Sequence, residues 1–362
     1  MRAAAPVGMF AAGQAAGLVA VVWVGAAGGW GVPRILQLWD AGRLLAIARA
    51  GYGQPSADGV DLHAFFPGVP LAVRAVHALT GLGFLASAVT VSAVAGVALA
   101  CGLDRLTTQL IGPGPAARRC AVFLAGALPL SVVLVMPYTE APFCALTVWT
   151  LVFLGEARWL AAGTGACACG LVRPTAVALV AAVAVGAAAS WYAGHPDRVR
   201  ALVACAVAPL GALAYLGWAA ATTGHLDAWS RAEANGWGAR IDPAALASWL
   251  PWAVREGLGP IEISVMAGMV TLALTVGALV LVRAPGHVVA YVTTFLALVA
   301  GTDGVWNSKF RIMMPALLIT CVLAAGALCR LRTPARAGVL TTVAALGCWF
   351  STFAILVYPH AI

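Results

Sequence analysis

Eleven apolar segments limit what this chain can fold into. They cover residues 8–29, 79–101, 120–137, 141–155, 159–172, 175–193, 201–221, 261–282, 287–302, 312–329 and 337–358. A helix needs about 20 apolar residues to cross the hydrocarbon core of a bilayer, and a helix satisfies its own backbone hydrogen bonds there. The pattern predicts an all-α polytopic membrane protein with about 11 transmembrane helices. The short segments 141–155 and 159–172 could also be tilted, re-entrant or wrongly divided.

The composition agrees with a membrane protein and excludes several functions. Hydrophobic residues make up 62% of the 362 residues and charged residues only 9%, against roughly 25% charged residues in soluble domains. The formal net charge is +8, but the basic residues are scattered singly, which argues against nucleic acid as a partner. The sequence has no phosphate-binding loop, dinucleotide fingerprint or paired-histidine zinc motif. The sequence therefore argues against ATP hydrolysis and hydride transfer.

The distribution of arginine predicts the orientation. We treat residues 1–362 as one integral membrane domain of the cell membrane, with the first apolar segment as an uncleaved helix and a signal peptide as the alternative. A cytoplasmic N-terminus places short, arginine-rich connections inside, as the positive-inside rule requires. Two long outer loops then cover residues 30–78 and 222–260, and most acidic residues lie on their side of the membrane. The chemistry is therefore expected on the extracytoplasmic side.

The first outer loop has helical character from Trp39 to Arg49 and is stopped by Gly51. Such a helix would lie along the membrane surface with Trp39 as an interfacial anchor. Asp40 stands at its N-terminal end, where a carboxylate could serve only to cap the helix. Farther on, Pro67 and Pro70 are expected to break the helix in a loop that re-enters the membrane. Asp58 and Asp61 are loop carboxylates in our interpretation, although one of them could support a metal.

Several short motifs follow one another in a recognisable order. They are Trp39-Asp40, Ile47-Ala48-x-x-Gly51-Tyr52, Phe65-Phe66-Pro67-x-x-Pro70-x-x-x-Arg74, Pro137-Tyr138-Thr139-Glu140, Arg173-Pro174-Thr175, and Ser308-Lys309-Phe310-Arg311 with Pro315. This series resembles the PIG-V-like mannosyltransferases, which are integral membrane glycosyltransferases of the GT-C fold with many actinobacterial members. The motifs extend from about residue 37 to residue 315. The resemblance implies a GT-C-like helical bundle with short amphipathic helices in the first outer loop.

The resemblance also implies a reaction. An inverting glycosyltransferase of this kind moves a sugar, mannose in the family, from a polyprenyl-phosphate donor to an acceptor hydroxyl on a glycan, lipid or protein. Asp40 takes the role of catalytic base by the resemblance, and a carboxylate suits that role. The lipid phosphate needs cationic partners, and Lys309, Arg311 and Arg173 are the candidates. Interfacial snorkelling is the alternative for each of these side chains.

The remaining candidates would bind substrate or order the site. They are Trp39, Tyr138 and Glu140 of the motifs, with Arg43 and His63 of the first outer loop. Glu140 follows a Pro-Tyr break and could orient the acceptor or pair with a basic residue such as Arg173. No metal ligand set is recognised, and a divalent cation such as Mg²⁺ or Mn²⁺ stays open as a cofactor.

The second outer loop mixes tryptophans with charged residues, which suits either sugar stacking or an aromatic membrane belt. Residues 234–238 are expected to form a turn. Membrane lipids are expected partners throughout. The alternative function is a transporter or flippase of a lipid-linked sugar, which would need the basic residues but no acid heading an outer amphipathic helix.

Overall fold

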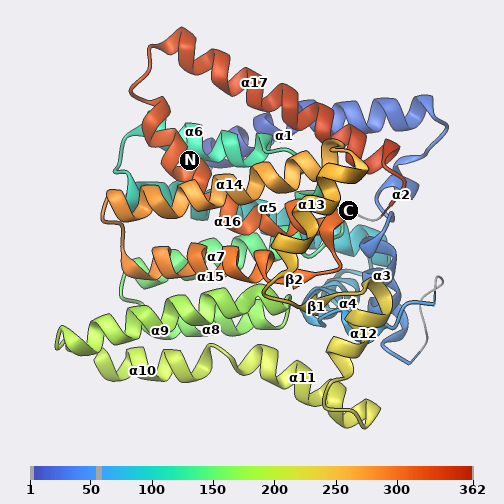
Figure 1. Ribbon diagram of the computed structural model, residues 1–362, viewed down its shortest axis with the longest axis horizontal. Coiled ribbons are helices and arrows are strands. Elements are labelled where there is room, and N and C mark those ends of the chain that lie inside the picture. The colour runs from blue at the N-terminus through green and yellow to red at the C-terminus, as the bar shows by residue number, and fades with distance from the viewer. Residues whose placement is uncertain (1–3, 54–58, 361–362) are drawn as a thin grey trace.

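The computed structural model describes residues 4–53 and 59–360, which are helical almost throughout (Figure 1). The α-helices are α1 (Ala4–Ala27), α2 (Val32–Ile35), α3 (Asp40–Ala50), α4 (Gly68–Thr80), α5 (Phe84–Leu110), α6 (Pro115–Ala127), α7 (Glu140–Gly155), α8 (Trp159–Gly170), α9 (Val177–Tyr192), α10 (Arg198–Val207), α11 (Leu210–Thr223), α12 (Ala228–Trp237), α13 (Ala245–Glu256), α14 (Pro260–Leu281), α15 (Gly286–Ala300), α16 (Lys309–Leu328) and α17 (Thr333–Thr352). Short 3₁₀ turns are η1 (Leu62–Ala64), η2 (Ser131–Leu134), η3 (Pro174–Ala176) and η4 (Trp306–Ser308), and a π-helical turn, η5 (Phe353–Val357), follows α17. Two short strands are β1 (Arg240–Ile241) and β2 (Thr302–Asp303).

The all-α membrane fold expected from the sequence is confirmed. Among the described residues, seven helical segments are long and apolar enough to cross a bilayer, and two shorter apolar helices, α7 and α15, accompany them. All eleven predicted segments coincide with helices, but the count of eleven crossings is approximate because several of these helices are short.

Three predicted boundaries are wrong, two of them because of proline. The segment 120–137 is not one helix: α6 ends at Ala127, Pro129 follows, and Leu130 has a φ of +66°. The segment 201–221 is divided between α10 and α11 around Pro209, which lacks the N–H that a continuous helix would use. In the opposite sense, α5 continues to Leu110, well beyond the predicted end at residue 101.

The bundle is held together by close helix packing around α16. Of the seven long segments, the one that contains α16 is the most buried, and α5, α6, α7, α14 and α15 pack around it. Glycines bring neighbouring helices together where α1 crosses α6. A Cβ on Gly13 would lie 2.4 Å from the Phe123 carbonyl oxygen, and one on Gly126 would lie 2.4 Å from that of Phe10. Small residues at such crossings are typical of membrane helices, because dispersion rather than hydrophobicity drives their association.

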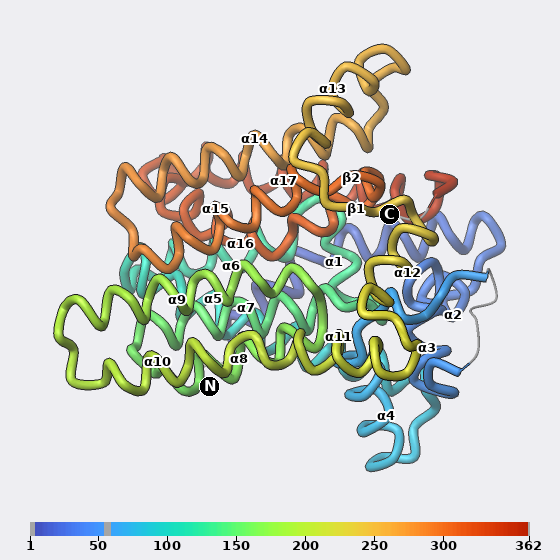
Figure 2. Tube along the Cα trace, turned by 60° about the horizontal axis from the view of Figure 1, so that its bottom comes forward, coloured from blue at the N-terminus to red at the C-terminus, as the bar shows by residue number. Residues whose placement is uncertain are grey.

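The two predicted outer loops gather at one end of the bundle, which we call the loop end. Helices α2, α3, α4 and α12 lie there together with the β1–β2 pair, on the right of Figure 1. The connections between α9 and α10 and between α14 and α15 lie at the opposite end. Strands β1 and β2 are antiparallel, with Arg240 opposite Asp303, and so they join the second outer loop to the connection before α16. Helix α13 projects away from the bundle (Figure 2).

The first outer loop differs from expectation at its prolines. Helix α4 begins at Gly68 and includes Pro70 in its first turn, so the two prolines start a helix instead of breaking one. Proline is tolerated there because the first backbone N–H groups of a helix have no intrahelical partner. In the second outer loop, the expected turn at 234–238 is instead the last turn of α12. That helix ends with Gly238 in the left-handed conformation.

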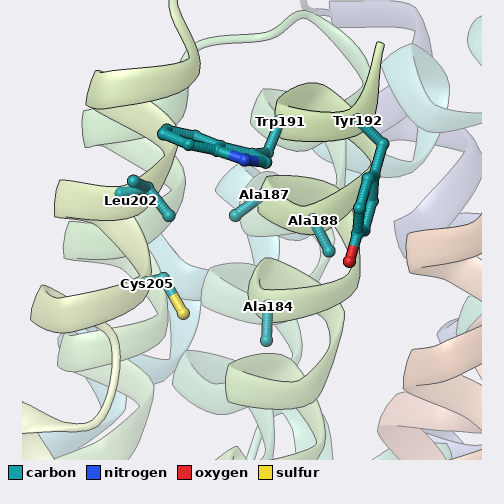
Figure 3. A pocket seen from close by; sticks show the side chains of 7 residues that line it. All are labelled: Ala184, Ala187, Ala188, Trp191, Tyr192, Leu202 and Cys205. Atoms are coloured by element: carbon teal, nitrogen blue, oxygen red, sulfur yellow. The ribbon is translucent and has the colours of Figure 1, made fainter. Parts of the chain in front are cut away.

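An apolar groove of about 420 Å³ lies between α9 and α10, away from the loop end (Figure 3). Trp191 and Tyr192 of α9 and Leu202 and Cys205 of α10 line it together with alanines. The groove has no charged lining residue, so it offers no acid, base or phosphate ligand.

Candidate functional site at the loop end

Asp40 bridges two arginines at the start of α3. Its Oδ1 lies 3.1 Å from Nη1 of Arg43, one helical turn later, and its Oδ2 accepts a hydrogen bond of 2.5 Å from Nη2 of Arg311 on α16. The N-cap residue is Trp39, with a φ of +54° that is uncommon for a residue other than glycine, and no side chain caps the helix. Within the described residues, the contacts of the Asp40 carboxylate are thus with arginine side chains.

Arg311 extends the ion pairs into the bundle. Its Nε lies 3.3 Å from Oε1 of Glu140, the first residue of α7. Nη1 of Arg173, in the extended residue before Pro174, lies 2.9 Å from the same oxygen. Charge therefore alternates along the series Arg43–Asp40–Arg311–Glu140–Arg173, which we call the charge ladder. Alternation of sign is the arrangement that makes buried charges tolerable, because each has an opposite partner.

The members of the charge ladder differ in how far solvent reaches them. The exposed fraction of the side chain is 17% for Asp40, 12% for Arg43 and Arg173, 7% for Arg311 and 1% for Glu140. Asp40 is thus the most accessible acid and Glu140 the most enclosed. Buried ionisable groups at membrane depth are costly and usually functional.

Aromatic rings line the charge ladder. The guanidinium carbon of Arg311 lies 5.2 Å from the ring centre of Tyr138, and that of Arg173 lies 5.9 Å from the ring centre of Phe143. The Tyr138 hydroxyl donates a hydrogen bond of 3.1 Å to the carbonyl oxygen of Leu38, just before α3. Tyr138 therefore ties the entrance of α3 to the start of α7 and belongs to the site that the sequence predicted.

His63 lies in an aromatic cluster of its own. Its Nδ1 is 2.7 Å from Oδ1 of Asp61, its ring stacks on Tyr52 at 5.3 Å, and Trp218 lies 5.8 Å away. The Tyr215 hydroxyl of α11 donates a hydrogen bond to the His63 carbonyl oxygen. The structure thus joins His63 to α11 rather than to the charge ladder. Asp58 lies outside the described residues.

Lys309 does not reach the charge ladder. Its ammonium group donates to the carbonyl oxygens of Val299, at 2.6 Å, and Thr302, and it lies 3.3 Å above the ring of Trp306. The side chain is buried. Lys309 and Arg311 were predicted as a pair of phosphate ligands, and the structure brings only Arg311 into contact with Asp40 and Glu140.

The second outer loop contributes residues that sequence reasoning did not place in the site. Trp237 of α12 lies 5.4 Å from the guanidinium carbon of Arg43 and 5.7 Å from the ring of Phe65. Glu233 lies one turn earlier on α12, and its pKa is raised by burial and by the charge of Asp40 and lowered by that of Arg173. Trp229, Glu233 and Trp237 are each four residues apart, so on a helix they lie on one face. This spacing is the sequence signal from which the three residues could have been predicted to act together.

No metal cluster is formed within the part of the chain that the structure describes: no group of three His, Cys, Asp or Glu side chains converges there. The charge ladder itself holds only two carboxylates, and guanidinium groups lie against both. What this arrangement can do chemically is bind an anion and place a carboxylate at its edge.

Comparisons with solved structures identify the fold. Over 83% of this chain and 56% of the other, the protein superposes on ArnT from Cupriavidus metallidurans, solved bound to undecaprenyl phosphate, with a TM-score of 0.54 and 12% identity. An oligosaccharyltransferase from Archaeoglobus fulgidus, in complex with Zn and sulfate, gives a TM-score of 0.45 at 12% identity over 86% of this chain and 47% of that one. The chain thus spans about half the length of the structures it matches. No protein-family model and no curated protein matches the sequence. The likeness to ArnT and the helical bundle together show that this chain has the GT-C fold of integral membrane proteins.

Proposed function

We propose that this protein is an inverting glycosyltransferase that takes a sugar from a polyprenyl-phosphate donor and passes it to an acceptor hydroxyl. The charge ladder is the observation that carries the proposal, because it gathers three arginines and two acids from α3, α7, α16 and the segment before η3 at the loop end. The fold adds support, since ArnT, which shares it, was solved with undecaprenyl phosphate.

Arg311 and Arg173 would bind the donor phosphate. A guanidinium group has five N–H donors in a fork that matches phosphate oxygens. The described ion pairs engage two nitrogens of Arg311 and one of Arg173, so donors are left for a ligand. In a site shielded from water, these charges would also stabilise the phosphate as it leaves.

Asp40 would act as the base. In the reaction, the acceptor oxygen bonds to the anomeric carbon as the bond between that carbon and the phosphate oxygen breaks, and the bonding electrons leave with the phosphate. The acceptor proton passes to a carboxylate oxygen of Asp40, the most accessible acid of the ladder. In this structure Arg311 donates a hydrogen bond to Oδ2 of Asp40. When the sugar donor binds, Arg311 would turn toward its phosphate and free that oxygen for the proton.

The finer assignments rest on the PIG-V-like motifs. They support mannose as the sugar and an active site on the extracytoplasmic side of the cell membrane, where the two long loops would lie. The acceptor would be a glycan, a lipid or a protein.

The test is transfer of radiolabelled sugar from polyprenyl-phosphate mannose in membranes that contain the wild type or Asp40→Asn. The wild type is expected to transfer the sugar, and Asp40→Asn should lose about 10²- to 10⁴-fold in rate, the usual contribution of a general base. Asp227→Asn is the matched control. That acid also lies in an outer loop, but its side chain is 62% exposed and only loosely paired, 3.9 Å from Arg231.

Two outcomes would contradict the proposal in different ways. Full transfer by an equally expressed Asp40→Asn variant would remove Asp40 from the role of base. If the wild type transferred no sugar but moved the lipid-linked sugar across proteoliposome membranes, the protein would instead be a flippase.

A further inference from the structure

Helix α12 carries one acidic residue between two tryptophans on a single face. Trp229, Glu233 and Trp237 follow one another at intervals of four residues, so their side chains lie in a row along the helix. The ring of Trp229 contacts that of Phe66 at 6.1 Å, and the ring of Trp237 contacts that of Phe65 at 5.7 Å. The row therefore faces the first outer loop, with Glu233 between two aromatic contacts. We call these three residues the α12 row.

The α12 row lies beside the charge ladder. Figures 1 and 2 both place α12 next to α3, which begins with Asp40. Trp237 covers the guanidinium group of Arg43 at 5.4 Å. Besides burial, the negative charge of Asp40 raises the pKa of Glu233, and the positive charge of Arg173 lowers it. Among the described residues, no cation lies within 4 Å of the Glu233 carboxyl to form an ion pair, in contrast to both acids of the ladder.

We propose that Glu233, flanked by Trp229 and Trp237, binds the acceptor of the transfer reaction, and that this acceptor is a sugar whose hydroxyl hydrogen-bonds to the Glu233 carboxylate. The inference rests on the proposed function and assigns the acceptor side of the same site. A carboxylate accepts hydrogen bonds from hydroxyl groups, whereas aromatic rings offer flat apolar faces to the C–H surface of a sugar ring. Glu233 is thus a binding residue, and Asp40 keeps the proton.

The surroundings of Glu233 make this binding sensitive to pH. Burial, followed by the nearby negative charge of Asp40, raises the pKa of Glu233 to about 7, whereas Arg173 and the indole N–H of Trp229 act in the opposite direction. The other charged or titratable groups on α12 and on the described elements around it are Arg231 on α12 itself, Asp40, Arg43 and Arg49 on α3, His63 on η1, Tyr215 on α11 and Arg240 on β1. Since only the ionised carboxyl is purely an acceptor, the sugar should bind more tightly above this pKa than below it.

The experiment measures binding of octyl α-mannoside to the full chain in lipid nanodiscs, at about pH 8 and about pH 6, either side of the pKa of about 7. Tryptophan fluorescence reports occupancy. The wild type is expected to bind more tightly at the higher pH. Glu233→Gln should weaken binding by about tenfold or more at that pH, as expected for a lost hydrogen bond to a charged group, and should abolish the pH dependence. Glu233→Asp should restore part of both.

Separate readouts keep this inference apart from the proposed function and from misfolding. Undecaprenyl phosphate binding and thermal stability should be unchanged in Glu233→Gln, and Glu256→Gln, an exposed acid of the same outer loop, should behave as wild type throughout. Equal mannoside binding by wild type and Glu233→Gln, a pH dependence that persists in Glu233→Gln, or no mannoside binding by the wild type would each overturn the inference. Failure of the wild type to bind undecaprenyl phosphate would instead refute the proposed function.

Discussion

Arg311 on α16 and Asp40 on α3 lie 271 positions apart in the sequence, and their side chains meet at 2.5 Å. This ion pair links a helix in the centre of the bundle to the short helix that opens the first outer loop. Through Glu140 and Arg173 the same contact continues to the start of α7 and to the segment before η3. Four segments that are far apart in the chain are thus held in one place by charge.

The Glu140–Arg173 pair should be strongly coupled. Glu140→Gln leaves two guanidinium groups without their shared acid in the interior, and breaking a buried pair in this way costs about 3–5 kcal/mol. Arg173→Gln removes the other partner. In a double-mutant cycle measured by unfolding in detergent, the two substitutions should show a coupling energy of about 0.5–3 kcal/mol.

The matched control is the Arg158–Glu156 pair, which lies 3.7 Å apart with the arginine 60% exposed. Solvent screens such a pair, so its coupling should be close to zero, within about 1 kcal/mol. Additive effects of Glu140→Gln and Arg173→Gln would show that the short contact between them contributes nothing.

Lys309 and Arg311 should respond to substitution in opposite ways. Lys309→Met leaves the carbonyl oxygens of Val299 and Thr302 without their ammonium donor, so it should lower thermal stability and leave undecaprenyl phosphate binding intact. Arg311→Lys keeps a charge but loses the planar fork of donors, so it should weaken phosphate binding by about tenfold or more. Both are measured by thermal unfolding and by binding to nanodiscs. Weaker phosphate binding by a normally stable Lys309→Met would assign Lys309 to the phosphate after all.

The crossing of α1 and α6 should tolerate no side chain at Gly13. An added methyl group would meet the Phe123 carbonyl oxygen at 2.4 Å, and the helices would have to separate. Gly13→Ala should therefore destabilise the protein by about 1–3 kcal/mol, the usual cost of overpacking. Gly8→Ala on the same helix has open space and should be neutral or slightly stabilising, because alanine is the better helix former. Equal melting temperatures for the two variants would contradict the packing seen at this crossing.

Acid should loosen the strand pair that joins the second outer loop to the connection before α16. The indole N–H of Trp306, the backbone N–H of Gly304 and the Arg240 guanidinium lower the pKa of Asp303 below its ordinary value of 3.8. An acid with a lowered folded-state pKa contributes stability above its unfolded pKa and loses it as the pH falls through the folded value. Amide exchange of β1 and β2, relative to the intrinsic rate at the same pH, should therefore accelerate below about pH 4 in the wild type. In Asp303→Asn it should be fast at neutral pH too, and slow exchange in that variant would show that the carboxylate does not hold the strands.

The sequence by itself determined the class of protein and the location of its helices. Hydrophobicity is a local property, so each of the eleven apolar segments is largely helical, although 120–137 and 201–221 are each interrupted. The acids and arginines that meet in the structure were already visible as short motifs around Asp40, Glu140 and Arg173. Helix ends were less certain, because Pro70 starts a helix whereas Pro209 divides one. The difference depends on whether the proline stands at a position whose backbone N–H would have an intrahelical partner, and the presence of proline in the sequence does not reveal that position.

Only the tertiary structure decided which charged side chains share a site. Lys309 and Arg311 are two positions apart, and residues at that spacing on a helix point to different sides. One therefore turns to the carbonyl oxygens before α16 while the other meets Asp40 and Glu140. Likewise, nothing local connects Trp229 and Trp237 with Phe66 and Phe65 of the first outer loop, because those ring contacts depend on how α12 packs against the segment around η1. The rotation of each helix and the return of each loop are set by packing across the whole bundle.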